Sequence, residues 1–293
     1  MKILVTGANG MLAKEVKERF SEGNEIIATD VAELDITNEE SVMKYITDLQ
    51  PDYVINCAAF TAVDKAEECY ELADKINGDG PTNLAKAAKA AGAKLVHIST
   101  DYVFGGDLDV SKDYKEDDEK APVTVYGKTK LHGEEGIEKN MDEYYIFRTA
   151  WLYGIGGNNF VKTMTKLGST RDEISVVSDQ HGSPTYAKDL TEIIYQAITK
   201  KIPYGIYNAT NNGYTTWYDF TKEILKEQGI VAFSQEAGAS VAMHGAPGFG
   251  MYGVDVLVEG DEAKKAIQII EAADDSQNKE KFWHFYGSVI IWL

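Results

Sequence analysis

Tyr126 and Lys130 stand four residues apart in the stretch VYGKTK (125–130), just after a loop that contains Pro122. If this stretch is helical, both side chains lie on the same face of the helix. Reduction of a carbonyl group requires a proton at its oxygen, and a tyrosine phenol can donate one. For exchange near neutrality the phenol pKa must fall by roughly three units from about 10, and a nearby ammonium group lowers it. Such pairs are common on helix surfaces, so the interpretation depends on the neighbouring motifs.

A second group of polar residues, in STDYVF (99–104), ends an apolar run. We expect Thr100 to orient a substrate oxygen and Tyr126 to donate the proton. Lys130 is expected to lower the Tyr126 pKa, together with the positive nicotinamide of an oxidised cofactor, and to hydrogen-bond the nicotinamide ribose. Thr100, Tyr126 and Lys130 are therefore the candidate catalytic residues.

The motif TGANGMLA (6–13) follows an apolar run directly and precedes a stretch with helical spacing. In this context Gly7 permits a tight turn, Gly10 lets the backbone approach a pyrophosphate, and Ala13 allows close packing of helix and strand. Free N–H groups at the helix start then bind the anion. Asp30 ends the next apolar run, where a carboxylate can accept from a ribose hydroxyl. Asp30 disfavours a 2'-phosphate and so favours NADH, although a nearby Arg or Lys would admit NADPH.

Two further stretches, LDIT (34–37) and CAAFTAVD (57–64), follow apolar runs. Ligands of open α/β sheets bind at the carboxyl ends of the strands. We therefore expect the first stretch to pass under an adenine and the second to let a dinucleotide lie close. Together they line one crevice.

The elements that position these motifs alternate regularly. β-branched apolar runs cover residues 2–7, 25–30, 53–59, 94–100 and 144–151, and helical spacing covers 11–20, 39–49, 63–76, 80–91 and 126–138. This alternation predicts an α/β fold, a doubly wound parallel sheet of the Rossmann type. We expect a dinucleotide-binding domain over residues 1–150, with a return segment near 174–203. A smaller substrate-binding region is expected over 151–173 and 204–293.

Composition narrows the class of partner. The 293 residues carry a formal net charge of -18, which disfavours nucleic acid and anionic membrane surfaces as partners. No apolar run approaches the roughly 20 residues that span a bilayer, and no signal sequence opens the chain. The only two cysteines, Cys57 and Cys69, have no metal-ligand spacing and do not make a disulfide framework. We expect a cytoplasmic protein with a small-molecule substrate.

Taken in order, the motifs TGANGMLA, LDIT, NCAAFTAVDKAE, ISTDYVFGG, YGKTKLHGE, FRTAWLYG, VVSDQHGSPT and GIYNATNNGYTTWYDF resemble the dTDP-4-dehydrorhamnose reductase family, a group of extended short-chain dehydrogenases. The resemblance runs from residue 1 to about residue 229. It implies that NADPH or NADH reduces the 4-keto group of a dTDP-4-dehydro-6-deoxy-L-mannose to give dTDP-L-rhamnose.

The resemblance also assigns site residues. Thr100, Tyr126 and Lys130 match the catalytic positions, and Asp101 and Trp151 match the sugar-nucleotide site together with Thr100 and Tyr126. The positions that match cofactor contacts are Gly7, Gly10, Met11, Leu12, Asp30, Asp35, Ile36, Ala58, Ala59, Thr61 and Lys130. Some members use Mg²⁺ and pair as homodimers; Glu15 matches one acidic position associated with the ion, although one carboxylate is not a metal site.

The sequence departs from the family pattern at several positions and is compatible with two alternative functions. Gly105 and Ala13 differ from the usual family residues, and residues 230–293 do not resemble the family's C-terminal segment. One alternative is a non-catalytic dinucleotide-binding regulatory subunit, like that of methionine adenosyltransferase. Another is a nucleotide-sugar epimerase or dehydratase. The complete set Thr100, Tyr126 and Lys130 favours the reductase.

Overall fold

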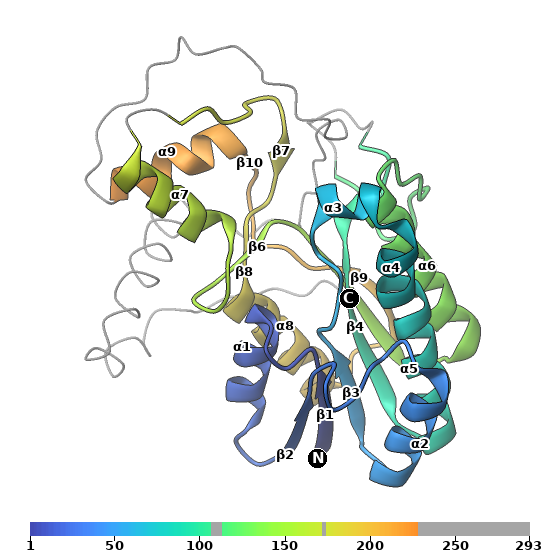
Figure 1. Cartoon of the computed structure of the whole chain (residues 1–293). Helices are drawn as coiled ribbons and strands as arrows, with labels where there is room; N and C mark the ends of the chain where they lie inside the picture. Colours follow the sequence, from blue (N-terminus) through green and yellow to red (C-terminus); the bar gives the residue numbers. More distant parts are fainter. Residues whose placement is uncertain (107–112, 172–173, 228–293) are drawn as a thin grey trace.

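The computed structural model describes residues 1–106, 113–171 and 174–227, and the atypical segment 230–293 lies outside them. Its centre is a six-stranded parallel sheet with the strand order β2-β1-β3-β4-β5-β9 (Figure 1). The strands are β1 (Lys2–Thr6), β2 (Glu25–Thr29), β3 (Tyr53–Asn56), β4 (Lys94–Thr100), β5 (Tyr144–Thr149) and β9 (Gly205–Asn208). The predicted doubly wound α/β fold is confirmed.

Helices cover both faces of this sheet (Figure 1). One face packs against α1 (Met11–Phe20) and α8 (Ala187–Lys200) around Ile3, Val5 and Ile55. The other face packs against α2 (Glu39–Leu49), α5 (Gly80–Ala91) and α6 (Val125–Asn140) around Leu4 and Val54. Neighbouring residues of one strand thus enter different cores, which explains why the strands are apolar without alternation.

Two sequence predictions of elements need correction. The helix expected over residues 63–76 is interrupted at Cys69, giving α3 (Val63–Glu68), α4 (Tyr70–Asp74) and a π-helical turn (Lys75–Asp79). The sequence also placed residues 204–293 wholly in the substrate region, whereas β9 pairs with β5 in the large sheet. The sheet therefore continues beyond the predicted return segment.

A smaller region lies over the carboxyl ends of the strands (Figure 1). It holds two short ladders, β6 (Leu152–Tyr153) with β8 (Thr185–Tyr186) and β7 (His181–Gly182) with β10 (Thr215–Thr216). The helices α7 (Phe160–Thr170) and α9 (Trp217–Glu227) share an aromatic core with these strands. This placement agrees with a substrate-binding role for the region, which stays a prediction.

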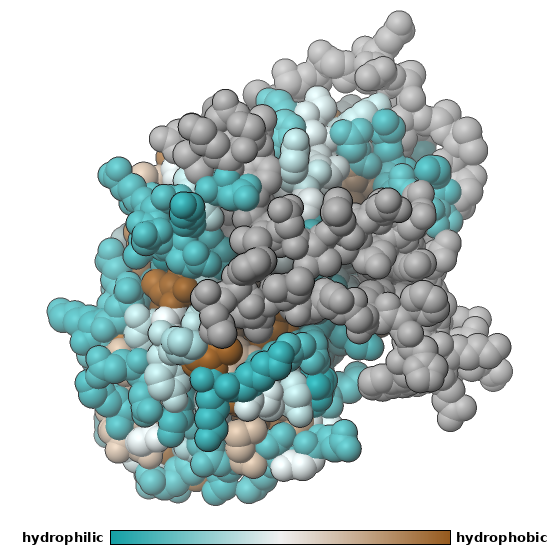
Figure 2. Space-filling view, turned by 180° about the vertical axis from the view of Figure 1, so that it is seen from behind, coloured by the Kyte–Doolittle hydropathy of each residue, from teal (hydrophilic) through white to brown (hydrophobic). Residues whose placement is uncertain are grey.

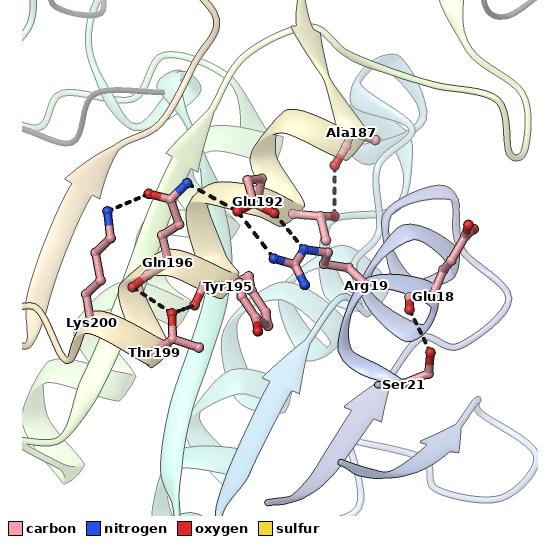
Figure 3. Close-up of polar contacts among 10 residues, drawn as sticks. Glu18, Arg19, Ser21, Ala187, Glu192, Tyr195, Gln196, Thr199 and Lys200 are labelled. Atoms are coloured by element: carbon pink, nitrogen blue, oxygen red, sulfur yellow. Dashed lines mark hydrogen bonds and ion pairs between the residues drawn. The ribbon is translucent and has the colours of Figure 1, made fainter. Parts of the chain in front are cut away.

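The contact between α1 and α8 fixes the helix that follows the glycine loop (Figure 3). The Arg19 guanidinium donates to both carboxylate oxygens of Glu192, at 2.6 and 3.4 Å, and lies 3.4 Å above the Tyr195 ring centroid. Gln196 donates to the same Glu192 carboxylate at 3.2 Å. Because the ion pair is partly exposed, its contribution to stability is modest, and the apolar contact beneath it does most of the packing.

The surface agrees with the acidic composition. The face shown in Figure 2 is mainly hydrophilic where the described residues are visible, with small separate hydrophobic patches. Within the described ranges, no helix combines the length and the apolar character that crossing a bilayer would require.

Candidate active site

The glycine loop between β1 and α1 has the geometry of an anion site. Gly7 has a φ of +66°, and a Cβ atom there would lie 2.7 Å from the backbone of Ala58 at the end of β3. Only glycine allows this approach of the two strand ends. Gly10 precedes α1, and no side chain caps the first turn. The N–H groups of that turn are therefore available to a phosphate, as the sequence predicts.

Asp30 lies beside this loop, at the end of β2. One carboxylate oxygen accepts from the backbone N–H of Asn9 at 3.0 Å, and the other accepts from that of Val31 at 2.8 Å. These bonds hold the carboxylate rigidly next to the phosphate loop. It keeps lone pairs for further donors, such as the hydroxyls of a ribose.

The other predicted cofactor residues lie in loops at the same sheet edge, with different exposure. Ala58, Ala59 and Thr61 follow β3, where the two alanines are partly buried. Asp35 is exposed and caps its own loop through Thr37, whereas the Ile36 side chain is buried against Gly80. Only the backbone of Ile36 is therefore well placed to meet a ligand.

Met11 and Leu12 open α1 and differ in surroundings. Leu12 is buried in the core, and Met11 is partly exposed. The Asn159 side chain of the smaller region donates to Gly154 O at 2.6 Å and reaches the Met11 sulfur at 3.7 Å. The two regions therefore meet directly at the start of the phosphate-loop helix.

Thr100, Asp101 and Tyr126 form the centre of the site. The Thr100 hydroxyl donates to a carboxylate oxygen of Asp101 at 2.9 Å, and both residues lie close enough to Tyr126 to shift its pKa. Thr124 caps α6 by accepting from Gly127 N at 3.0 Å, which starts the helix one residue before Tyr126. The structure thus brings Thr100, Asp101 and Tyr126 together, and their catalytic and substrate-binding roles stay a prediction.

The electrostatics of Tyr126 differ from the expectation. Burial and the nearby Asp101 carboxylate raise the pKa of Tyr126, and the neighbouring Thr100 hydroxyl offsets this only in part. The predicted lowering by Lys130 is not found, because the Lys130 ammonium is directed to other partners. In this structure Tyr126 therefore keeps its proton through neutral pH.

Lys130 is buried below Tyr126 and faces β4. Its Nζ atom donates to Ile98 O at 2.6 Å and lies 3.1 Å from His97 Nε2. Burial lowers the pKa of Lys130 to about 8, although the Glu134 carboxylate opposes that change. His97 was not identified from the sequence; the available signal was a histidine enclosed by apolar residues in LVHI, residues 95–98.

Trp151 belongs to the aromatic cluster of the smaller region. Its indole stacks on Trp217 with ring centroids 3.5 Å apart, and Phe160 covers Trp217 at 4.3 Å. Trp151 has a φ of +44°, a conformation that costs energy for a large side chain. Trp217 was missed in the sequence because its partner comes from a loop more than sixty residues earlier.

Gly182 on β7 provides the space for the Trp151 ring. A Cβ atom at this position would lie 2.3 Å from the indole. We expect Gly182→Ala to displace Trp151 and to raise KM for the substrate roughly tenfold, about 1.4 kcal/mol, with a smaller change in kcat. Ser169→Ala, at an exposed position of α7 in the same region, is the control. Steady-state kinetics measure both, and an unchanged KM in Gly182→Ala contradicts the prediction.

The described residues show no group of three side chains that could ligate a metal ion. Glu15 is partly buried on α1; burial and the nearby Glu18 raise its pKa, and Lys188 lowers it. The magnesium expectation thus gains no support from the described part of the chain.

Comparisons with known proteins agree with this geometry. The family model described as the RmlD substrate binding domain matches residues 1–245. The chain is 45% identical over 230 residues to the spore coat polysaccharide biosynthesis protein SpsK of Bacillus subtilis strain 168, covering 78% of this chain and 80% of that protein. It is 44% identical over 229 residues to the dTDP-4-dehydrorhamnose reductase of Streptomyces griseus, covering 76% of this chain and 75% of that protein.

A solved structure supports the same relationship. The dTDP-4-dehydrorhamnose reductase of Bacillus anthracis strain Ames, in complex with NADP, superimposes with a TM-score of 0.82 at 37% identity. The match covers 93% of this chain and 99% of that chain. The relationship therefore extends from individual motifs to nearly the whole architecture.

Proposed function

Because this chain belongs to the RmlD substrate binding domain family, we propose that it reduces the 4-keto group of dTDP-4-dehydro-6-deoxy-L-mannose to give dTDP-L-rhamnose. The observation that carries the proposal is the convergence of Thr100, Asp101 and Tyr126 at the sheet edge that also bears the phosphate loop. A pure binding module would not need a phenol, a hydroxyl and a buried lysine at this point. The enzyme is an NAD(P)H-dependent oxidoreductase.

The residues of the cofactor site fit a nicotinamide dinucleotide. The uncapped first turn of α1 would hold the pyrophosphate, Gly7 leaves room for it, and Asp30 would accept from a ribose hydroxyl. When bound, such a cofactor supplies the hydride for the carbonyl carbon. The chain itself must place the ketone and provide the proton.

Tyr126 is suited to donate that proton from its Oη atom. Its raised pKa keeps the phenol protonated through neutral pH, so a proton is available at Oη for transfer. A general acid of this kind must reach the carbonyl oxygen within hydrogen-bonding distance. We propose that the Thr100 hydroxyl binds the same oxygen and aligns it with Tyr126.

Asp101 is the candidate for recognition of the sugar. Its Oδ2 atom is buried and has no hydrogen-bond partner among the described residues, so it is open to a donor from a substrate. Burial raises the pKa of Asp101 to about 7, and the Thr100 hydrogen bond lowers it in part. The Trp151 indole would supply the apolar surface next to it.

Asp30 is expected to set the preference between NADH and NADPH. Replacing Asp30 with Ala removes the acceptor for a ribose hydroxyl and a negative charge that repels a 2'-phosphate. We expect Kd for NADH to rise about tenfold in Asp30→Ala, with Kd for NADPH unchanged or lower. Fluorescence titration of both cofactors measures this. Equal losses for the two cofactors would remove Asp30 from the ribose site.

The proposed function is tested by following nicotinamide absorbance when the full chain meets dTDP-4-dehydro-6-deoxy-L-mannose with NADH or NADPH. Stoichiometric oxidation of the cofactor with formation of dTDP-L-rhamnose is the expected result. Binding of the cofactor without turnover contradicts the reductase and favours a regulatory subunit. Repeating the assay with EDTA tests the use of magnesium that the resemblance implies for some family members.

A further inference from the structure

A line of buried polar side chains crosses three neighbouring strands and ends at Lys130. Thr6 on β1 donates to Asn56 Oδ1 on β3 at 2.7 Å, and Asn56 Nδ2 lies 3.0 Å from His97 Nδ1 on β4. His97 Nε2 in turn lies 3.1 Å from Lys130 Nζ on α6. Thr6, Asn56, His97 and Lys130 are all buried, so each polar atom must find its partner within the line.

The direction of the Asn56 amide is fixed by the backbone. The N–H group of Ala58 can only donate, and it lies 3.1 Å from Asn56 Oδ1. If the amide were turned over, its NH₂ group would face this N–H donor. The Asn56 NH₂ group therefore faces His97 Nδ1, and because an NH₂ group only donates, Nδ1 must be the acceptor.

This bond determines which nitrogen of His97 carries the proton. With Nδ1 accepting, a neutral imidazole has its hydrogen on Nε2. That hydrogen is directed at Lys130 Nζ, and a protonated ammonium there would face it donor to donor. A neutral Lys130 amine instead accepts from His97 Nε2–H and still donates to Ile98 O at 2.6 Å. The neutral amine is thus the form that satisfies every hydrogen bond in the line.

We propose that His97 is a positioning residue for the reductase site, which acts through Lys130: Asn56 locks the Nε2–H tautomer of His97, and that tautomer favours the neutral amine of Lys130. The effect of His97 on turnover rests on the proposed function. The assignment of the hydrogen bonds does not. The motif VHIST does not by itself predict a catalytic role for the histidine, and the proposed mechanism gives His97 none.

The charges around the pair agree with this assignment. Burial and the positive charge of Lys130 lower the pKa of His97 well below its usual value, so His97 does not become a second cation. The Glu134 carboxylate, one turn along α6, raises the pKa of Lys130 and is itself neutralised by Arg148 of β5, at 2.7 Å. Directly after β4, Asp101 lies near Tyr126.

A pH dependence of turnover follows. When Tyr126 gives up its proton, a protonated Lys130 stabilises the phenolate that remains, so turnover falls as pH rises through the pKa of Lys130. The pKa of Tyr126 is raised far above neutrality, whereas that of Lys130 is lowered to about 8. Lys130 therefore loses its proton first, and His97 controls where the alkaline limb lies.

Nitrogen-15 NMR of the histidine side chains tests the assignment without any need for activity. The full chain, labelled with ¹⁵N-histidine, contains five histidines, and His97→Gln identifies the signal of His97. We expect His97 to remain neutral with the proton on Nε2 at every pH between about 5 and 9. A proton on Nδ1, or titration with an ordinary histidine pKa, would overturn the proposal.

Two substitutions change the group that faces Lys130: one moves the proton of the His97 imidazole, and the other replaces the imidazole. In Asn56→Asp a carboxylate accepts from Nδ1–H, which frees Nε2 to accept from the Lys130 ammonium. In His97→Gln the side-chain carbonyl can accept from that ammonium without an added charge. Both changes are expected to move the alkaline limb of kcat upward by about one pH unit. The control His132→Gln, on the partly exposed face of α6 against Asp74, should leave the limb in place.

The outcomes separate the two proposals. An unchanged limb in both variants, in protein that still binds cofactor, overturns the positioning role of His97. A wild-type protein without any turnover contradicts the proposed function instead, while the NMR result still decides the tautomer. If His97→Gln does not fold, Asn56→Asp and the spectrum of the unaltered chain supply the test.

Discussion

Tyr126→Phe is expected to lower kcat about 10²- to 10⁴-fold while leaving the Kd for the nicotinamide cofactor nearly unchanged. The substitution removes only the Oη atom, so the ring keeps its edge-on contact with Tyr102 at 5.5 Å. The proton that must reach the carbonyl oxygen then has no donor at that point. Stopped-flow measurement of cofactor oxidation, with a cofactor titration on the same protein, checks both halves of the prediction.

Tyr102→Phe is the matched control, because it removes a hydroxyl from the ring that faces Tyr126 and leaves Tyr126 Oη in place. We expect a far smaller change in kcat for it. A near-normal kcat in Tyr126→Phe would show that another acid, for which Asp101 is the nearest candidate, supplies the proton. Loss of cofactor binding together with turnover would indicate a structural role instead.

The sequence predicted the parts of the site that depend on local pattern. Gly7, Gly10 and Asp30 follow apolar runs directly, and parallel strands bring their carboxyl ends to one edge, so their proximity was predictable. The YxxxK spacing placed Tyr126 and Lys130 on one helix face for the same local reason. The strand β9 was missed because its four residues, GIYN, lie within a loop rich in Gly and Asn and gain their pairing only from β5.

What could not be predicted depends on partners from distant elements. The pKa of Tyr126 is raised because of burial and the nearby Asp101, and the Lys130 Nζ atom is turned away from Tyr126 because it hydrogen-bonds His97 Nε2 and Ile98 O. The spacing of residues along α6 predicts neither the raised pKa of Tyr126 nor the direction of Lys130. The stacking of Trp217 on Trp151 is likewise visible only once α9 is packed against the smaller region.

The helix that carries Tyr126 and Lys130 is fixed to the sheet by a fully buried ion pair. Arg148 on β5 donates to both carboxylate oxygens of Glu134, at 2.9 and 2.7 Å, and neither side chain is exposed. Arg148 also donates to Glu116 O at 3.0 Å and lies 5.0 Å from the Phe104 ring centroid. The guanidinium therefore depends on Glu134 for its neutralising charge, and α6 depends on the pair for its position over the site.

Glu134→Ala is consequently expected to lower the free energy of unfolding by about 3–5 kcal/mol, because it leaves a buried cation without its counter-charge. Chemical denaturation followed by circular dichroism measures this, and Glu39→Ala, which breaks the exposed pair with Lys86, should cost much less. The double variant Glu134→Met with Arg148→Met decides the cause. If desolvated charge is responsible, the double variant is more stable than Glu134→Ala, since no unpaired charge remains. A double variant as unstable as the single one would mean that the pair acts through packing, and that α6 is held by shape rather than by charge.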